Sequence, residues 1–563
     1  MKRRYWVVSP NVSNNPAEEP VWKKVIFEKK IAFMGYYENH DLGYKFSHDI
    51  QKGDIILIAQ GGNQNKRLFI GGIVTTDAIW EIYDNSPREA YNRVLSPCLS
   101  KKELESIDLN FTDSAFGAAE RIPSLYELHP YRNDVDKKIV DRIELALKIK
   151  TQQQKMQEKI DLLEYKKQII LQGPPGTGKT KTAKDIAVEM LGLGNVKDLN
   201  NNERFKLIQF HPSYTYEDFV RGIVSVPNED GEGVLFKTEN KILAEFAEKA
   251  LKNKLDSQKG ASLLSKEKWL NEQFDKFIDF ISEEIDQNRK VELTESVFII
   301  ALDNDAFRYK GTQGWTEKGT RMLFKDIKQA FLDNNTIRQE LKHNQNVSRS
   351  AYWDATYFIK TVDLFRKFLI DEQITFVVDT TENEPLKNYV LIIDEINRAN
   401  LPSVLGELIY ALEYRDEAVE SMYEFEGKRE IILPSNLYII GTMNTADRSV
   451  GHIDYAIKRR FAFVDVLPTD QAIDDVVTDP DLNAKAKDLY HKVAELFNED
   501  KSKSVYLQSD FKAKDVQLGH SYFLIETEKQ LELKLEFEIR PLLNEYVKDG
   551  ILSEDALIEI AKL

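Results

Sequence analysis

The stretch KQIILQGPPGTGKTKTAKDIAVEML, residues 167–191, decides the fold of this chain. Its apolar start predicts a buried strand, its middle is rich in glycine, and its end has the pattern of a helix. Strand, Gly-x-x-x-x-Gly-Lys-Thr and helix, in that order, predict a phosphate-binding P-loop. Backbone N–H groups of such a loop surround phosphates, and the helix dipole favours their negative charge. The sequence therefore predicts a nucleotide-binding α/β domain.

Two side chains of the loop have particular tasks. Lys179 is expected to reach the β- and γ-phosphates, and the Thr180 hydroxyl is expected to bind Mg²⁺. A plain glycine turn is the alternative, but a strand before the loop and a helix after it favour nucleotide binding. The complete set of expected nucleotide contacts is Gly173, Pro174, Pro175, Gly176, Thr177, Gly178, Lys179 and Thr180.

An acidic pair follows the next strongly apolar strand. In YVLIIDEINRAN, residues 389–400, four apolar residues precede Asp394 and Glu395. Asp394 is expected to join Thr180 at the Mg²⁺, and Glu395 to orient or deprotonate the attacking water. An Asp-Glu pair after a strand can also merely cap a helix. The P-loop upstream favours the catalytic interpretation.

A third strand, NLYIIGTMN, is followed by polar residues and then by arginines. If its end lies beside Asp394, Asn444 can point at the γ-phosphate or the attacking water, as the sensor residue of an AAA+ protein does. The segment SVGHIDYAIKRRFAFVDV, residues 449–466, predicts a short helix ending in Arg459 and Arg460, then a strand. These arginines could reach the nucleotide of a neighbouring subunit. Alternatively, they are a solvated helix end that offsets the helix dipole.

Taken together, the motifs resemble the McrB family, the motors of modification-dependent restriction systems. The segments that carry the resemblance are GPPGTGKT, IQFHPSYTYEDFVRGI (208–223), LIIDEINRANLPSVLGELIYALE (391–413), GTMNTADRS (441–449), RRF (459–461) and LGHSYF (518–523). The resemblance implies an AAA+ ring, expected to be a hexamer, that hydrolyses GTP and drives an McrC-like endonuclease partner. It also implies that Asn444 and Asp447 help to assemble the hydrolytic site.

The preference for GTP rests on this resemblance alone, and ATP stays open. One string, Asn253-Lys254-Leu255-Asp256, fits the Asn-Lys-x-Asp pattern with which other GTPases recognise guanine. However, it continues the charged helical run ILAEFAEKALKNKLD, whereas the guanine-binding string follows a buried strand. We therefore interpret it as part of a solvated helix.

The N-terminal segment predicts a small, mostly β domain. Its runs YWVVSP, KIAFMGYY, GDIILIAQ and RLFIGGIVTT resemble EVE and PUA-like barrels, which implies recognition of a modified base flipped out of the stack. Residues 1–76 carry 11 Lys and Arg against 7 Asp and Glu, which suits a polyanion. Aromatic side chains could equally be core residues. The candidates for the base pocket are Trp6, Trp22, Tyr36, Tyr37 and Trp80.

The sequence thus predicts a multidomain α/β protein: residues 1–135 as the EVE/PUA-like reader, 136–165 as a helical connector, 166–465 as the AAA+ core and 466–563 as a helical lid. Thr180 and Asp394 are 214 residues apart, which predicts an α+β insertion at about 236–375. Its Arg308, Tyr309, Lys310, Trp315, Lys318, Arg321 and Lys325 could contact DNA or be core aromatics among surface bases. Gly519, His520 and Ser521 are expected near the nucleotide or the interdomain hinge, although His520 could be purely structural.

Composition sets outer limits on function. Cys98 is the only cysteine, which excludes an internal disulfide and fits a cytoplasmic protein. No apolar run is long enough to span a membrane, and the net charge of −16 confines any DNA contact to local surfaces. No nuclease site stands out, so cleavage is assigned to a partner. The rival hypothesis is an AAA+ ATPase that remodels proteins, with the N-terminal barrel as an adaptor.

Overall fold

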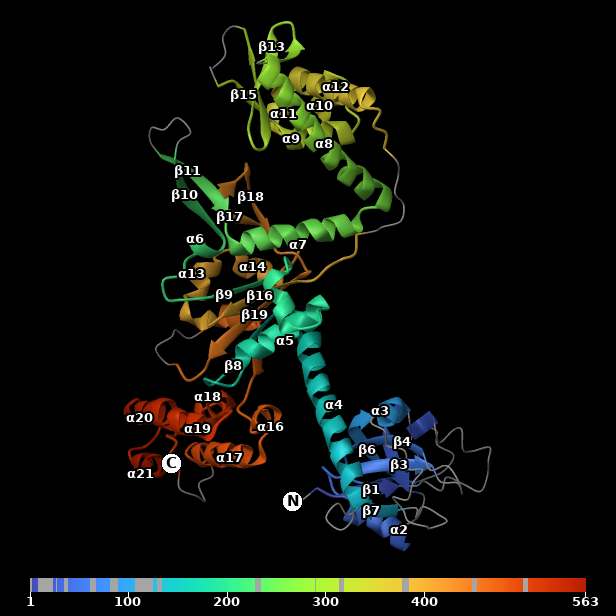
Figure 1. Ribbon diagram of the computed structural model, residues 1–563, viewed down its shortest axis with the longest axis vertical. Helices are drawn as coiled ribbons and strands as arrows, with labels where there is room; N and C mark the ends of the chain where they lie inside the picture. Colours follow the sequence, from blue (N-terminus) through green and yellow to red (C-terminus); the bar gives the residue numbers. More distant parts are fainter. Residues whose placement is uncertain are drawn as a thin grey trace. The chain divides into compact units, whose positions relative to one another are not determined.

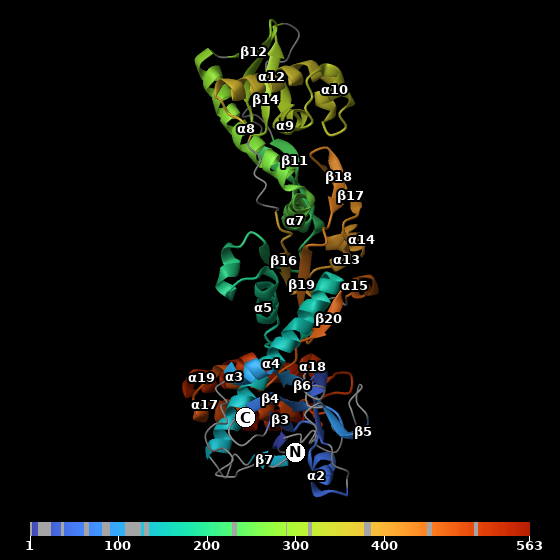
Figure 2. The ribbon, with the colours of Figure 1, turned by 90° about the vertical axis from the view of Figure 1, so that its right-hand side faces the viewer.

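The computed structural model describes residues 3–8, 24–26, 28–34, 39–60, 67–81, 90–106, 125–128, 134–227, 234–288, 290–312, 318–376, 384–447, 453–499 and 505–563. It divides into two compact units, Met1–Tyr165 and Lys166–Leu563 (Figures 1 and 2).

A seven-stranded sheet organises the N-terminal unit. Its order is β2-β6-β4-β3-β1-β7, with β5 paired to β6. Among the described strands, β1 and β3 pair in parallel and the other neighbours pair antiparallel. The strands are β1 (Tyr5–Val8), β2 (Ile31–Met34), β3 (Ile55–Gln60), β4 (Arg67–Val74), β5 (Ile79–Glu81), β6 (Ala90–Leu99) and β7 (Leu125–Leu128). All four apolar runs of the N-terminal sequence contain one of these strands, so a strand-rich region is confirmed.

Helices cover parts of this sheet. The short α2 (Asp41–Tyr44) continues into a π-helical turn, Lys45–Asp49, and α3 (Lys101–Ser106) follows β6. The long α4 (Asp134–Lys166) buries Ile139, Ile143 and Leu147 against the apolar side of β1 and β3. The first half of α4 therefore belongs to the core of the N-terminal unit.

A parallel five-stranded sheet in the order β20-β8-β19-β16-β9 is the centre of the second unit. Its strands are β8 (Gln168–Gly173), β9 (Phe205–Gln209), β16 (Tyr389–Asp394), β19 (Leu437–Asn444) and β20 (Ala462–Asp465). Ile170, Leu391 and Ile439 are buried in its core, as expected for strands covered on both faces. Because all the strands point the same way, their carboxyl ends gather the predicted polar residues at one edge.

Helices and two hairpins surround this sheet. The P-loop helix α5 (Lys179–Leu191), α6 (Tyr216–Phe219), α7 (Ile242–Gln258), α13 (Leu401–Leu405) and α14 (Leu408–Glu413) lie close to it (Figure 1). One hairpin pairs β10 (Arg221–Pro227) with β11 (Val234–Asn240), and the other pairs β17 (Ala418–Phe425) with β18 (Lys428–Ile432).

The insertion has an apolar core of its own, separate from that of the sheet. Its members run from Leu270 to Leu369, whereas Leu243, Phe246 and Ala250 of α7 pack in the core of the parallel sheet. The structurally separate part therefore begins at α8, later than residue 236. It contains α8 (Ala261–Asn288), β12 (Val291–Thr294), β13 (Val297–Leu302), β14 (Ala306–Gly311), β15 (Thr320–Leu323), α9 (Phe324–Leu332), α10 (Arg338–His343), α11 (Arg349–Trp353) and α12 (Ala355–Asp371).

A helical region follows β20 and has a third core. It consists of α16 (Gln471–Val476), α17 (Pro480–Glu495), α18 (Ala513–Val516), α19 (Glu528–Lys534), the π-helical turn Leu535–Ile539, α20 (Arg540–Lys548) and α21 (Ala556–Lys562). This confirms the predicted C-terminal helical region. In the part of the chain that the structure describes, no helix combines the length and apolar character needed to cross a membrane.

Candidate nucleotide-binding site

Glycines shape the P-loop between β8 and α5. Gly176 and Gly178 have φ angles of +77° and +79°, a region that side chains with a Cβ rarely adopt. A Cβ on Gly173 would lie 2.3 Å from the carbonyl oxygen of Val466, which follows β20. These positions therefore need glycine for conformation and for close approach of two strands.

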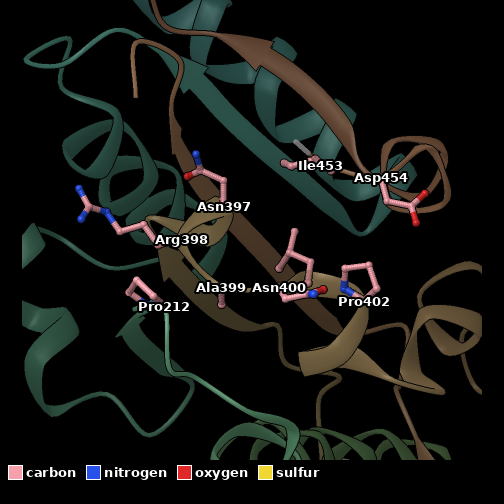
Figure 3. Close-up of a pocket in the computed structure, with 9 residues that line it drawn as sticks. Pro212, Asn397, Arg398, Ala399, Asn400, Pro402, Ile453 and Asp454 are labelled. Carbon is pink, nitrogen blue, oxygen red and sulfur yellow. The ribbon is translucent and has the colours of Figure 1, made fainter. Parts of the chain in front are cut away.

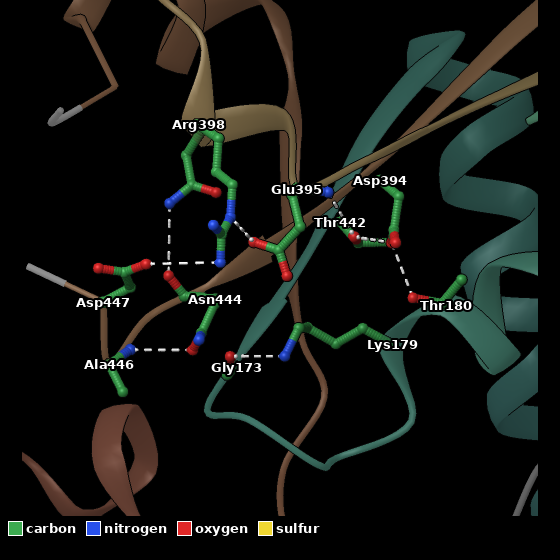
Figure 4. A network of polar contacts seen from close by, with 11 residues as sticks. Gly173, Lys179, Thr180, Asp394, Glu395, Arg398, Thr442, Asn444, Ala446 and Asp447 are labelled. Carbon is green, nitrogen blue, oxygen red and sulfur yellow. Dashed lines mark hydrogen bonds and ion pairs between the residues drawn. The ribbon is translucent and has the colours of Figure 1, made fainter. Parts of the chain in front are cut away.

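Lys179 lies buried at the start of α5. Its Nζ donates hydrogen bonds to the carbonyl oxygens of Gly173 and Pro174 at 2.9 and 2.8 Å (Figure 4). Burial lowers the pKa of Lys179 to about 8, although Glu395 and Asp394 act in the opposite direction. The ammonium group thus lacks a full counter-charge, which a phosphate would supply.

Asp394 accepts two hydroxyl donors on one oxygen. Thr180 Oγ1 donates to Asp394 Oδ1 at 2.7 Å, and Thr442 Oγ1 donates to the same oxygen at 2.5 Å. Thr442 also accepts the backbone N–H of Glu395 at 3.2 Å. The sequence predicted the meeting of Thr180 with Asp394. It gave no role to Thr442, whose signal is its place near the end of the strand next to β16.

Glu395 is held by its backbone and by an arginine. Its φ angle is +51°, unusual for a residue with a side chain, and it starts the turn that follows β16. Arg398 Nε donates to Glu395 Oε2 at 3.2 Å, and Arg398 Nη2 lies 3.7 Å from Asp447 Oδ2 (Figure 4). Arg398 therefore links the two acidic residues, a role that the sequence analysis missed.

The end of β19 is fixed on both sides. Asn444 pairs in register with Gly173, and its Oδ1 accepts the backbone N–H of Ala446 at 3.2 Å. Its carbonyl oxygen accepts the amide of Asn397 at 3.4 Å, and the N–H of Thr445 donates to Gly173 at 3.1 Å. Asn444 thus lies between the P-loop and the acidic turn, as its sequence position predicts.

The two arginines of α15 (Tyr455–Arg460) have different surroundings. Arg459 is 68% exposed and pairs with Glu413 Oε2 at 2.7 Å, whereas Arg460 is only 13% exposed and contacts the same oxygen at 3.2 Å. Arg460 Nη1 also donates to the carbonyl of Ala456 at 2.8 Å. The exposed Arg459 can turn outward, while Arg460 is held within its own subunit.

The helical region touches the P-loop directly. The N–H of Gly519 donates to Pro175 at 2.9 Å, and that of Ser521 donates to Gly176 at 3.0 Å. A Cβ on Gly519 would lie 2.0 Å from the carbonyl carbon of Gly176. Burial and Lys181 lower the pKa of His520. Its buried Nδ1 has no hydrogen-bond partner among the described residues, so a ligand atom could supply one.

A pocket of about 340 Å³ lies beside the acidic turn (Figure 3). It is lined by Pro212, Asn397, Arg398, Ala399, Asn400, Leu401, Pro402, Ile453 and Asp454. Asn397 is 7% exposed, and its Oδ1 has no hydrogen-bond partner among the described residues. Residues 397–402, shortly after Glu395, therefore line this pocket.

The oxygen ligands suit Mg²⁺ rather than a metal held by protein alone. Thr180 and Asp394 offer one hydroxyl and one carboxylate, and Mg²⁺ commonly takes its other ligands from phosphates and water. Within the described ranges, no group of three or more His, Cys, Asp and Glu could hold a metal ion. The residues present thus fit Mg²⁺ that arrives with a nucleotide.

Together, the parallel sheet, the P-loop and the acidic and polar strand ends define an AAA+ protein. The family described as "AAA domain (dynein-related subfamily)" matches residues 331–461, and "McrB, alpha-helical lid domain" matches residues 506–551. The "Type IV methyl-directed restriction enzyme EcoKMcrB subunit" of Escherichia coli K12 is 36% identical over 182 residues, which cover 30% of this chain and 39% of that protein. The chain therefore contains an AAA domain and a helical lid domain of the McrB type.

A second relative comes from another restriction system. The "Type II restriction enzyme BsuMI component YdiS" of Bacillus subtilis 168 is 40% identical over 90 residues, covering 14% of this chain and 26% of that protein. In both cases the matched segment spans well under half of the relative. The matches therefore concern parts of the chain.

The predicted base-pocket residues belong to the N-terminal unit or lie outside the described residues. Trp6 is 4% exposed, and its indole N–H donates to Asp54 at 3.1 Å, so it is a core residue of the N-terminal unit. Trp80 packs edge-on against Tyr91 with ring centroids 4.9 Å apart. Trp22, Tyr36 and Tyr37 lie outside the described residues.

The guanine-like string is part of α7. Asn253 is buried and accepts the N–H of Lys387, while Lys254 pairs with Asp416 at 2.6 Å. The side-chain polar groups of Asn253 and Lys254 are thus paired with other groups of the protein. The string is therefore a helix segment, as interpreted, but it is not solvated throughout, because Asn253 is buried.

The basic and aromatic segment of the insertion is largely neutralised. Tyr309 is fully buried, and Arg308 and Arg321 both bond to Asp303 at 2.9 Å. Arg321 also pairs with Asp305. The burial of Tyr309 and the ion pairs of Arg308 and Arg321 favour the alternative of a core aromatic among surface bases at these three positions. Trp315 lies outside the described residues.

Proposed function

We propose that the chain is the GTP-hydrolysing motor of a modification-dependent restriction system. The observation that carries the proposal is the meeting of Lys179, Thr180, Asp394, Glu395 and Asn444 at one sheet edge, in a chain whose lid matches the McrB lid domain. The printed descriptions of both relatives name restriction enzymes. An McrC-like endonuclease would then cleave the DNA.

The site residues have separate tasks in this proposal. Lys179 neutralises phosphate charge, while Thr180 and Asp394 hold Mg²⁺, which would draw charge from the phosphate oxygens. Glu395 positions the attacking water and takes up its proton. Asn444 lies next to both the loop and Glu395, so it can hold that water or the γ-phosphate in place.

Shared sites between subunits would explain the exposed arginine. Arg459 lies in the last turn of the short helix α15 with most of its side chain in solvent, which suits contact with a neighbour's nucleotide. Such a contact joins different faces of two subunits. Repeating it produces a closed ring when the rotation between neighbouring subunits adds up to a full turn. We propose a hexamer, with Glu413 holding Arg459 when no neighbour is present.

The N-terminal unit is proposed to recognise modified DNA. Its strand-rich sheet and the partly exposed Trp80 are compatible with a base pocket, whereas Trp6 is already packed in the core. We place the base-recognising residues on the surface that includes Trp80.

Hydrolysis of GTP and of ATP by the purified protein tests the proposal. Each nucleotide is assayed alone, with methylated duplex DNA, and with the endonuclease expressed from an adjacent gene. We expect a preference for GTP and stimulation by the nuclease. Glu395→Gln serves as the control for contaminating activity. ATP preference without a response to DNA or nuclease would favour the rival, an ATPase that remodels proteins.

A further inference from the structure

The insertion carries an exposed aromatic pair at the corner formed by α10 and α11. The side chains of Tyr352 and Trp353 are 41% and 72% exposed, and their ring centroids lie 5.4 Å apart in an edge-to-face arrangement. Large aromatic side chains are costly to leave in water. This pair therefore has the character of a binding surface.

Cations accompany the two rings. Lys342 Nζ lies 5.2 Å from the centroid of the Tyr352 ring. Arg349 lies four residues before Trp353 on α11, so the two share a face of that helix. Arg338 and Lys342 share a face of α10 for the same reason. Among the described residues, none of these three cations has an ion pair or a hydrogen bond from its side chain. In a chain with a net charge of −16, this grouping is unusual.

The nearby carboxylates are turned to other partners. Glu340 accepts the N–H groups of Thr336 and Ile337 at 2.6 and 3.3 Å. Burial raises the pKa of Tyr309, and the neighbouring Asp354 adds to this shift, so the Asp354 carboxylate lies beside Tyr309 in the interior. The corner therefore keeps its positive charge.

Buried residues fix α10 and α11 against the rest of the insertion. Leu341 of α10 and Ala351 of α11 are fully buried, and Ser348, which caps α11, donates to the buried Asp326 at 2.5 Å. The side chains on the outer side are thus presented on short, fixed helices. Binding to them would cost little backbone entropy.

We propose that this corner binds single-stranded nucleic acid, with unpaired bases stacking on Trp353 and Tyr352 and the phosphates beside Lys342, Arg349 and Arg338. Aromatic faces accept any base, and cations follow the backbone, which is the chemistry of binding without sequence preference. An acidic protein segment would use the cations but would not need a stacking face. The site therefore suits a strand whose bases are open.

Fluorescence anisotropy of the full chain with a labelled oligothymidylate of about 20 nucleotides tests the site. We expect Trp353→Ala to weaken binding about tenfold. Trp353→Phe should restore most of the affinity, while Trp353→Leu should not, because only the ring stacks. Arg349→Ala and Lys342→Ala should each reduce the slope of log affinity against log salt by about 0.7.

Phe537→Ala is the matched control, since its side chain in the helical region is also 72% exposed. Nucleotide hydrolysis without DNA should be the same in every variant, which separates this site from the motor. Equal strand binding by wild type and Trp353→Ala would overturn the assignment. So would equal affinity of Trp353→Leu and wild type, or displacement of the strand by polyglutamate as efficiently as by unlabelled DNA.

Discussion

Thr442 donates its hydroxyl hydrogen to Oδ1 of Asp394 at 2.5 Å. The same oxygen also accepts a hydrogen bond from the Thr180 hydroxyl. The Thr442 hydroxyl oxygen accepts the backbone N–H of Glu395, so this buried threonine orients both acidic residues. We expect Thr442→Val to lower hydrolysis about 10- to 100-fold, as the loss of a supporting hydrogen bond at a metal site typically does. Thr442→Ser, which keeps the hydroxyl, should retain most of the activity. Steady-state hydrolysis at saturating nucleotide measures both, and equal loss in the two variants would assign the effect to packing.

Glu395→Gln should separate binding from turnover. The amide keeps the shape of the side chain but cannot take up a proton, so we expect hydrolysis to fall by about 10²- to 10⁴-fold. Nucleotide affinity, measured by calorimetry, should stay within a factor of about three. Hydrolysis at the wild-type rate would remove Glu395 from its proposed role.

The two arginines of α15 should differ in what they control. Arg460→Ala creates a cavity at a largely buried position, so we expect it to lower the free energy of unfolding by about 2 kcal/mol. Arg459→Ala should leave the melting temperature unchanged and reduce hydrolysis about 10³-fold, if it acts on a neighbour's nucleotide.

Mixing two inactive variants tests whether Arg459 acts between subunits. Rings assembled from Arg459→Ala and Glu395→Gln contain some interfaces with both residues intact, so partial hydrolysis should return. If mixed rings remain as inactive as the pure ones, Arg459 acts within its own subunit or has no part in hydrolysis.

Gly519→Ala should disturb the contact between the helical region and the P-loop. Its Cβ would lie 2.0 Å from the carbonyl carbon of Gly176, and backbone cannot yield as a flexible side chain can. We expect nucleotide affinity to fall about tenfold, measured with a fluorescent nucleotide analogue. Gly260→Ala is the control, because a Cβ there meets nothing within 4 Å and the φ angle is not positive. Unchanged affinity in Gly519→Ala would mean that this contact does not support binding.

Lys179 makes nucleotide binding sensitive to alkaline pH. Its pKa of about 8 in the free protein should rise when phosphates bind, so binding takes up a proton above pH 8. Affinity should be full below that value and fall as pH rises through it. Calorimetry at pH 8.5 in buffers of different ionisation enthalpy measures the proton uptake. Lys179→Met should abolish it, and equal uptake by both proteins would point to another group.

Local motifs were enough to predict the parts of the site that lie close in sequence. The P-loop and the acidic pair each need only a strand and a few residues after it, and parallel pairing then brings Asn444 beside Gly173. The ion pairs of both Arg459 and Arg460 come from Glu413, which is 46 residues away from Arg459. The sequence of residues 449–466 does not indicate that contact.

Burial was harder to predict than secondary structure. The sequence left open whether Arg308 and Tyr309 face solvent or the core, because the alternation of side chains along their strand depends on which helices cover the sheet. Similarly, α7 has the charged sequence of a surface helix, and the packing of Leu243, Phe246 and Ala250 joins it to the main core. Contacts between distant segments decided both cases.

The place of the insertion also affects how the protein is made. It stands between Thr180 and Asp394, which are 214 residues apart and meet in the finished site at 2.7 Å. At roughly 5–20 residues per second, a ribosome synthesises Thr180 some 10–40 seconds before Asp394. During that time the separate core between Leu270 and Leu369 can fold by itself, while β8 still lacks both neighbouring strands, β19 and β20. The parallel sheet can therefore be completed only after the insertion has been synthesised.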